Sequence, residues 1–69
     1  MTDKELKRCK ECLDYFHVDY SGDVIFLTDS GNSCIMNPDS PWKDFLGHSI
    51  NSIARAVAEE LGKKIAWKE

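Results

Sequence analysis

One stretch near the C-terminus constrains the fold more than any other, because its apolar residues recur at the spacing of one face of a helix. These residues, at offsets 0, 3, 4, 7, 8 and 11 along the chain, are Ile50, Ile53, Ala54, Val57, Ala58 and Leu61. Such spacing predicts an amphipathic helix that packs one side on a core. Ser49 suits the N-cap and Gly62 the position just after the last turn, so we expect a helix over residues 50–61.

The N-terminal stretch has the same periodicity. Its apolar residues, again three or four apart, are Leu6, Cys9, Leu13 and Phe16. Thr2 and Glu5 have the spacing of a capping box, so we expect a helix that begins near Asp3. This register places Cys9 inward, Cys12 half-exposed at the edge of the stripe, and Tyr15 outward.

Strand and turn signals follow this first helix. Residues 24–28, VIFLT, form the most strand-like run in the chain. The short segment 17–20 precedes it across a Ser-Gly pair that suits a hairpin turn. After a second turn rich in Asp, Ser, Gly and Asn, residues 34–36 predict another strand. Two tight turns between three strands predict an antiparallel meander.

Two shorter elements complete the pattern. Ser40 followed by Pro predicts one helical turn over 41–46, in which Phe45 or Leu46 joins the core and Trp42 stays exposed. After the last long helix, residues 65–67 are apolar and lie between Lys64 and Lys68. They predict a short terminal strand or a docked tail.

The predicted fold class is α+β, a single domain over residues 1–69: helix, three-stranded antiparallel meander, helix, and a short C-terminal strand. This order of elements resembles the double-stranded-RNA-binding topology, which small toxin ribonucleases also use. The resemblance stops at topology. The lysine-rich start of the second helix is replaced by HSINSIARA, and no glycine-flanked histidine lies on a strand, so no functional residues carry over.

The three cysteines raise the question of a metal site. Cys9, Cys12 and Cys34 with His17 or His48 could supply the four ligands of a zinc-stabilised module. However, the helical period runs straight through the CxxC pair, and a second such pair is missing. We therefore expect free thiols, no metal and no cofactor. The sequence shows no secretory apolar region and no membrane-spanning run, which favours a cytoplasmic setting.

The charge pattern argues against a nucleic-acid surface. The net charge is −3, and residues 14–44 hold six aspartates but one basic residue, Lys43. Phosphate backbones are bound by clusters of Lys and Arg, so we expect no nucleic-acid partner. The sequence also lacks nucleophile, metal-hydrolase and phosphate-loop motifs, and we expect no enzymatic activity.

These observations lead to the hypothesis of a small, non-enzymatic protein-binding domain that docks on a larger partner through an acidic surface. A partner with a basic groove would fit, and the chain resembles in size and charge the small acidic inhibitors or accessory proteins encoded by phages and mobile elements. The candidate contact residues are Trp42, Tyr15, Asp19, Asp23 and Asp29. The alternatives are the zinc-stabilised module and a degenerate RNA-binding or nuclease fold.

Overall fold

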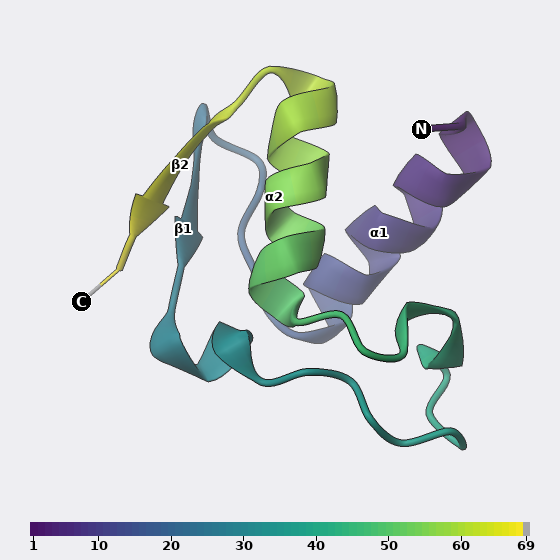
Figure 1. The fold of residues 1–69 in the computed structure, drawn as a ribbon. Coiled ribbons are helices and arrows are strands. Elements are labelled where there is room, and N and C mark those ends of the chain that lie inside the picture. The colour runs from purple at the N-terminus through teal and green to yellow at the C-terminus, as the bar shows by residue number, and fades with distance from the viewer. Residues whose placement is uncertain (69) are drawn as a thin grey trace.

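The structure, a computed structural model, describes residues 1–68. Its elements in chain order are α1 (Asp3–Tyr15), β1 (Val24–Leu27), the 3-10 helices η1 (Asp29–Asn32) and η2 (Lys43–Phe45), α2 (Ile50–Leu61) and β2 (Lys64–Trp67). Helix α2 lies at the centre, with the sheet packed on one side and α1 on the other (Figure 1).

The sheet has two parallel strands within the described residues. Their register pairs Val24 with Lys64 and Leu27 with Trp67. Parallel strands need a crossover connection, and the segment that contains α2 provides it. The predicted three-stranded antiparallel meander is therefore wrong, and with it the likeness to the double-stranded-RNA-binding topology.

The first predicted strand fails because its backbone groups find partners elsewhere. His17 has a positive φ of 61°, which turns the chain away from α1 and out of strand geometry. The Lys63 ammonium then binds the carbonyls of Tyr20 and Gly22, the latter at 2.7 Å. A lysine more than forty residues away in the chain thus takes the place of a hairpin partner.

The third predicted strand joins the start of α2 instead of β1. Cys34 forms an isolated antiparallel bridge with Ser49. Around it, the Ile35 amide donates to the His48 carbonyl at 3.0 Å, and the Gly47 amide donates to the Ile35 carbonyl at 2.8 Å. This segment therefore anchors the connection that leads into α2.

Both long helices are confirmed, together with their caps. The Thr2 hydroxyl accepts the Glu5 amide at 3.2 Å and donates to the Glu5 carboxylate at 3.0 Å. Ser49 accepts the Ser52 amide at 3.1 Å, and Gly62 ends α2 with a left-handed φ of 67°. Each of these groups satisfies a backbone donor or carbonyl that a helix end leaves unpaired.

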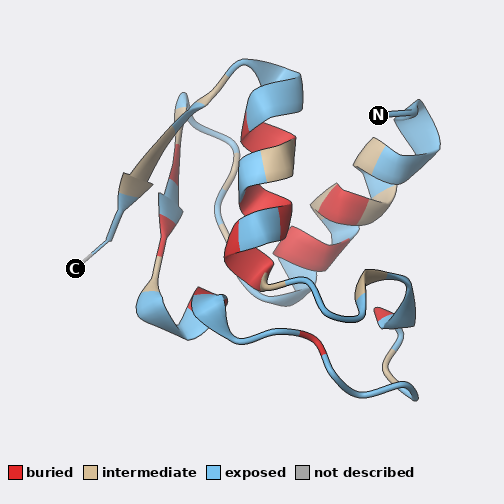
Figure 2. Cartoon of the chain, in the orientation of Figure 1, coloured by how far each residue is buried: buried red, intermediate tan, exposed pale blue. Residues whose placement is uncertain are grey.

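The core lies where α1, α2 and the sheet meet (Figure 2). Its buried apolar residues are Cys9, Cys12, Leu13, Ile25, Leu27, Ile35, Trp42, Ile50, Ile53, Ala54, Val57 and Ala58. Cys12 is fully buried, so its predicted half-exposure is wrong, because α1 packs on α2 over a wider face than its stripe suggests. Phe16, expected inward, follows the last turn of α1 and is 39% exposed.

Trp42 is 6% exposed, and the expectation of an exposed Trp42 is wrong. The Arg8 guanidinium lies 4.4 Å from the centre of its ring. Arg8 also donates to the Asp44 carboxylate at 2.9 Å and to the Pro41 carbonyl at 2.8 Å. One cation therefore holds the loop on α1, and its hydrogen bonds keep the pKa of the Asp44 carboxyl below its usual range. Phe45 packs partly buried against the same core.

Replacement of Trp42 by alanine tests this assignment. We expect Trp42→Ala to lower the free energy of unfolding by about 3–5 kcal/mol, because it leaves a cavity in the core. Trp67, which is 52% exposed, provides the control, and Trp67→Ala should cost about 1 kcal/mol or less. Urea denaturation followed by circular dichroism measures both. Equal losses from the two variants would contradict a buried Trp42.

A buried amide fixes η1 against the first turn of α2. The Asn51 side chain donates to the Thr28 carbonyl at 2.8 Å and to the Asn32 side-chain oxygen at 2.9 Å. Gly31 packs so close to this amide that an added Cβ would clash with it. The turn after β1 is therefore positioned by one polar side chain of α2.

This contact predicts a difference between two glycines. Gly31→Ala should lower the free energy of unfolding by about 1–3 kcal/mol, since the Asn51 amide must move and lose hydrogen bonds. Gly22 has no neighbouring atom closer to such a Cβ than 4.0 Å, so Gly22→Ala should change stability by about 0.5 kcal/mol or less. A Gly31→Ala variant as stable as the wild type in thermal unfolding would show that the amide does not hold η1.

Candidate binding groove

Two hollows adjoin at the C-terminal end of α1. The first, of about 680 Å³, lies between residues 16–19 and the β1–η1 segment. The second, of about 440 Å³, lies between the same end of α1 and residues 33–41. Phe16, Ser30 and Ile50 line both of them. We call the two hollows together the Phe16 groove.

Large apolar side chains stand exposed along this groove. Met36 is 72% exposed and Phe26 is 51% exposed, although both line it. Phe16 lines both hollows and Tyr15 lines the second, with their ring centres 4.9 Å apart, and we call these two rings the aromatic rim. The Tyr15 ring also lies 5.5 Å from the ring of buried Trp42. The core thus holds the aromatic rim in place.

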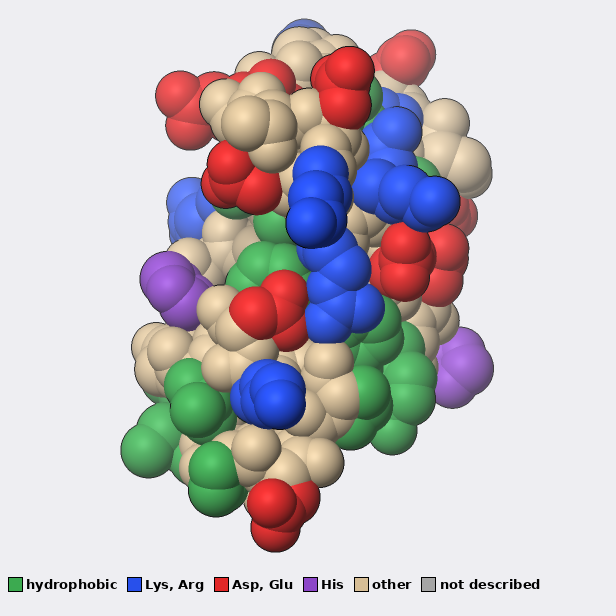
Figure 3. Space-filling view, turned by 90° about the vertical axis from the view of Figure 1, so that its right-hand side faces the viewer, with side chains coloured by type: hydrophobic (Ala, Val, Ile, Leu, Met, Phe, Trp, Pro, Cys, Tyr) green, Lys and Arg blue, Asp and Glu red, His purple; other side chains and the backbone are tan. Residues whose placement is uncertain are grey.

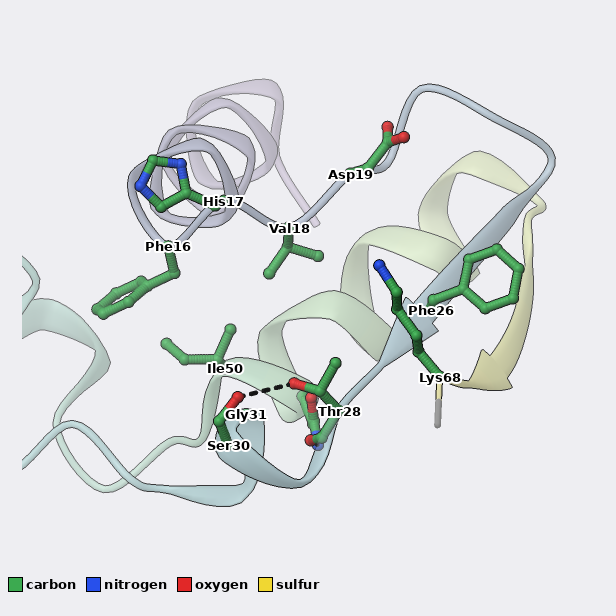
Figure 4. A pocket seen from close by; sticks show the side chains of 11 residues that line it. Phe16, His17, Val18, Asp19, Phe26, Thr28, Ser30, Gly31, Ile50 and Lys68 are labelled. Carbon is green, nitrogen blue, oxygen red and sulfur yellow. Dashed lines mark hydrogen bonds between the residues drawn. The ribbon is translucent and has the colours of Figure 1, made fainter.

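Some polar side chains of the first hollow form hydrogen bonds within the chain and others do not (Figure 4). The Asp19 carboxylate accepts the Ser21 amide at 3.0 Å and the Ser21 hydroxyl at 2.7 Å. These bonds, and more weakly the charges of Lys63 and Lys68, lower the pKa of Asp19. The Lys68 side chain lines the hollow, and its amino group is directed toward it (Figure 4). This amino group has no hydrogen-bond acceptor among residues 1–68.

The structure separates the residues that the sequence proposed as one contact surface. Tyr15 and Asp19 line the groove. Trp42 lies in the core, whereas Asp23 and Asp29 belong to the lining of neither hollow.

The aspartates of the middle section do not form the acidic meander expected from the sequence. Asp14 accepts a hydrogen bond from the Tyr20 hydroxyl at 3.1 Å, and Asp44 binds Arg8. The face that carries α1 has a band of Lys and Arg side chains, with acidic side chains on both sides of it (Figure 3). Charges of both signs alternate there, and several carboxylates serve internal contacts.

Four residues that line the groove were not among the candidate contact residues from the sequence: Phe16, Phe26, Met36 and Lys68. The four apolar residues of the VIFL run predict a strand but do not show which of its side chains face outward. A two-stranded sheet packed on one helix must leave one of its faces open. Ile25 and Leu27 are buried and Phe26 between them is exposed, so Phe26 marks the open face. Strand alternation gives this result once the strand is known to pack on one side only.

The three cysteines differ in how far they are buried, and the structure gives the zinc alternative no support. Cys9 and Cys12 are buried and Cys34 is exposed. Over residues 1–68, no three His, Cys, Asp or Glu side chains gather where they could hold a metal ion. Burial raises the pKa of Cys9 and raises that of Cys12 to about 11. Both thiols therefore stay protonated at neutral pH, and protonated thiols are poor nucleophiles.

No helix in the described part of the chain is long and apolar enough to cross a membrane.

No protein-family model matches the sequence. Comparison with curated proteins and with solved structures also finds no significant match. The geometry of the chain itself is therefore what bears on function.

The thiol environments predict an order of reaction with Ellman's reagent at pH 8. Cys34 should react at the rate of a free thiol, because it is exposed. Cys9 and Cys12 should react at least tenfold more slowly and reach that rate only in denaturant, because they are buried and protonated. The Cys34→Ser variant should lose the fast phase. A fast phase of more than one thiol in the folded wild type would contradict the packing of α1.

Proposed function

We propose that this chain is a non-enzymatic protein-binding domain that contacts its partner through the Phe16 groove. The observation that carries the proposal is that large apolar side chains line both hollows and stay exposed, with Phe26 51% exposed in the first and Met36 72% exposed in the second. A chain of 69 residues has few apolar residues to spare from its core. Apolar residues left gathered in a hollow are typical of an interaction site.

The energetics of the groove favour binding. Full burial of an apolar side chain such as Phe or Met contributes about 1.5–3 kcal/mol. Phe16 lines both hollows, Phe26 lines the first and Met36 lines the second. The rim is also held by contacts within the chain, because Tyr15 packs on Trp42 and Arg8 covers the Trp42 ring. An ordered surface loses less conformational entropy on association than a mobile one.

The polar groups of the groove support a contact role over a catalytic one. The hydroxyls of Thr28 and Ser30 lie 3.0 Å apart and bind each other. The Asp19 carboxylate is occupied by Ser21. General acid–base catalysis needs such groups within hydrogen-bond reach of a substrate. Here they form hydrogen bonds within the chain instead.

The hypothesis of docking through an acidic surface changes in its contact residues. The expected acidic meander does not exist, so the proposed contact moves from carboxylates to the apolar groove, with Tyr15 and Asp19 retained. A larger partner, an inhibitory or accessory role and a cytoplasmic location stay predictions from the sequence.

Site-specific photocrosslinking tests this proposal. A benzoylphenylalanine at position 36 in the groove should give discrete adducts with a partner in cells of the source organism. Arg55 is exposed on α2 and lines neither hollow, so the same probe at position 55 should give at least fivefold less. Circular dichroism of both variants controls for folding. Adducts of equal yield from both positions, or none from position 36, would refute the groove as the contact surface.

A further inference from the structure

Strand β1 has one edge that the fold leaves unpaired. At the two ends of the ladder, the amides of Lys64 and Lys68 donate to the carbonyls of Asp23 and Leu27, at 2.9 and 2.7 Å. Alternate residues of a strand direct their backbone groups to the same edge, so the odd-numbered residues of β1 face β2. The amides and carbonyls of Val24 and Phe26 then face the opposite edge, where no described residue bonds to them.

The first hollow of the groove runs beside this free edge. Phe26 and Thr28 of the β1 segment line one side of it, and His17, Val18 and Asp19 line the other. Figure 4 shows Val18 and β1 apart, with Ile50 below Phe16 and Val18 and close to Ser30 in this view. The segment that the sequence predicted as a hairpin partner thus stands away from β1 and leaves a slot in its place.

We propose that the slot takes an extended segment of a partner protein, which adds to β1 as a third strand and carries an acidic side chain. The inference rests on the proposed function and names the kind of segment that the groove recognises. Strand addition uses backbone groups that otherwise have only water as partner, so it gives affinity without a particular sequence.

The walls of the slot supply the preference for side chains. Side chains of an added strand alternate between two directions, so every second one can enter the apolar space near Val18, Phe16 and Ile50. The Lys68 ammonium faces the same hollow, and it is the one Lys or Arg side chain among the described residues that line it. Lys68 is therefore the group that selects a carboxylate.

The shape of the slot favours a single segment over a second copy of this chain. A free edge with nothing opposite it could pair with the same edge of another molecule. Here the wall formed by residues 17–19 stands opposite β1. A second folded copy would bring its own wall and groove into the same space, whereas one extended segment would not.

Phage-displayed random linear peptides, selected on the immobilised full-length chain, provide the probe. We expect the selected peptides to share apolar residues at alternate positions and an Asp or Glu. Lys68→Gln should weaken the best synthetic peptide by about 2- to 5-fold in calorimetry. Lys64 is also exposed on β2 but lines neither hollow, so Lys64→Gln should leave the affinity unchanged.

Backbone pairing has its own signature in amide hydrogen exchange. In the free chain, Val24 and Phe26 should exchange at least tenfold faster than Ile25 and Leu27, and the bound peptide should slow both. On the peptide side, N-methylation should abolish binding at every second residue only. Phe26→Pro removes an outward amide without touching the β2 ladder and should lower affinity at least tenfold, whereas Phe26→Ala keeps the amide and should lower it less.

The outcomes separate this inference from the proposed function. Peptides that bind without slowing Val24 and Phe26, or that tolerate N-methylation at every position, would overturn strand addition. So would a selection that yields no binder, or one that yields helical peptides. Crosslinks from position 36 would in those cases still support the groove as a contact surface, and their absence would remove the proposed function itself.

Discussion

Helix α2 packs against other elements on two of its sides, and the rest of the structure depends on that packing. Its buried residues, Ile50, Asn51, Ile53, Ala54, Val57 and Ala58, span an arc of about 160° at 100° per residue, wider than the stripe of an ordinary surface helix. One side of this arc receives the sheet and the other receives α1. Because α2 also lies between β1 and β2 in the chain, the two strands that pack on it run parallel.

The open groove follows from this arrangement. Strand β1 has two edges that can each pair with another strand. Strand β2 pairs with one of them, and the other edge stays open. The segment before β1 could have covered the other, but Lys63, which follows the Gly62 C-cap of α2, binds its Tyr20 and Gly22 carbonyls instead. Asn51, at the opposite end of α2, holds the turn after β1. The two ends of one helix thus position both neighbours of β1, and the space left beside the strand is the first hollow of the groove.

Local signals in the sequence located both long helices and the regions of β1 and β2, but they did not reveal the pairing, and they also predicted strands over 17–20 and 34–36 that do not form. The apolar periods and caps at Thr2, Ser49 and Gly62 predicted both helices, and residues 24–28 and 65–67 predicted the regions of both strands. The choice between a hairpin and a parallel ladder depended on Lys63, whose side chain acts on residues far away in the chain. Trp42 was misplaced for a similar reason, since its burial depends on Arg8 and Asp44 across the loop. Of the candidate contact residues, Tyr15 and Asp19 line the groove because they lie beside the end of α1, which periodicity locates.

The parallel pairing of β1 with β2 is the central claim, and backbone NOEs in the isotope-labelled chain test it most directly. We predict cross-strand NOEs that join Ile25 and Phe26 to Ile65 and Ala66, in the register of the structure. We also predict none between residues 17–20 and β1. NOEs of an antiparallel hairpin between residues 17–20 and 24–28 would contradict the account, because that hairpin would close the free edge and fill the groove.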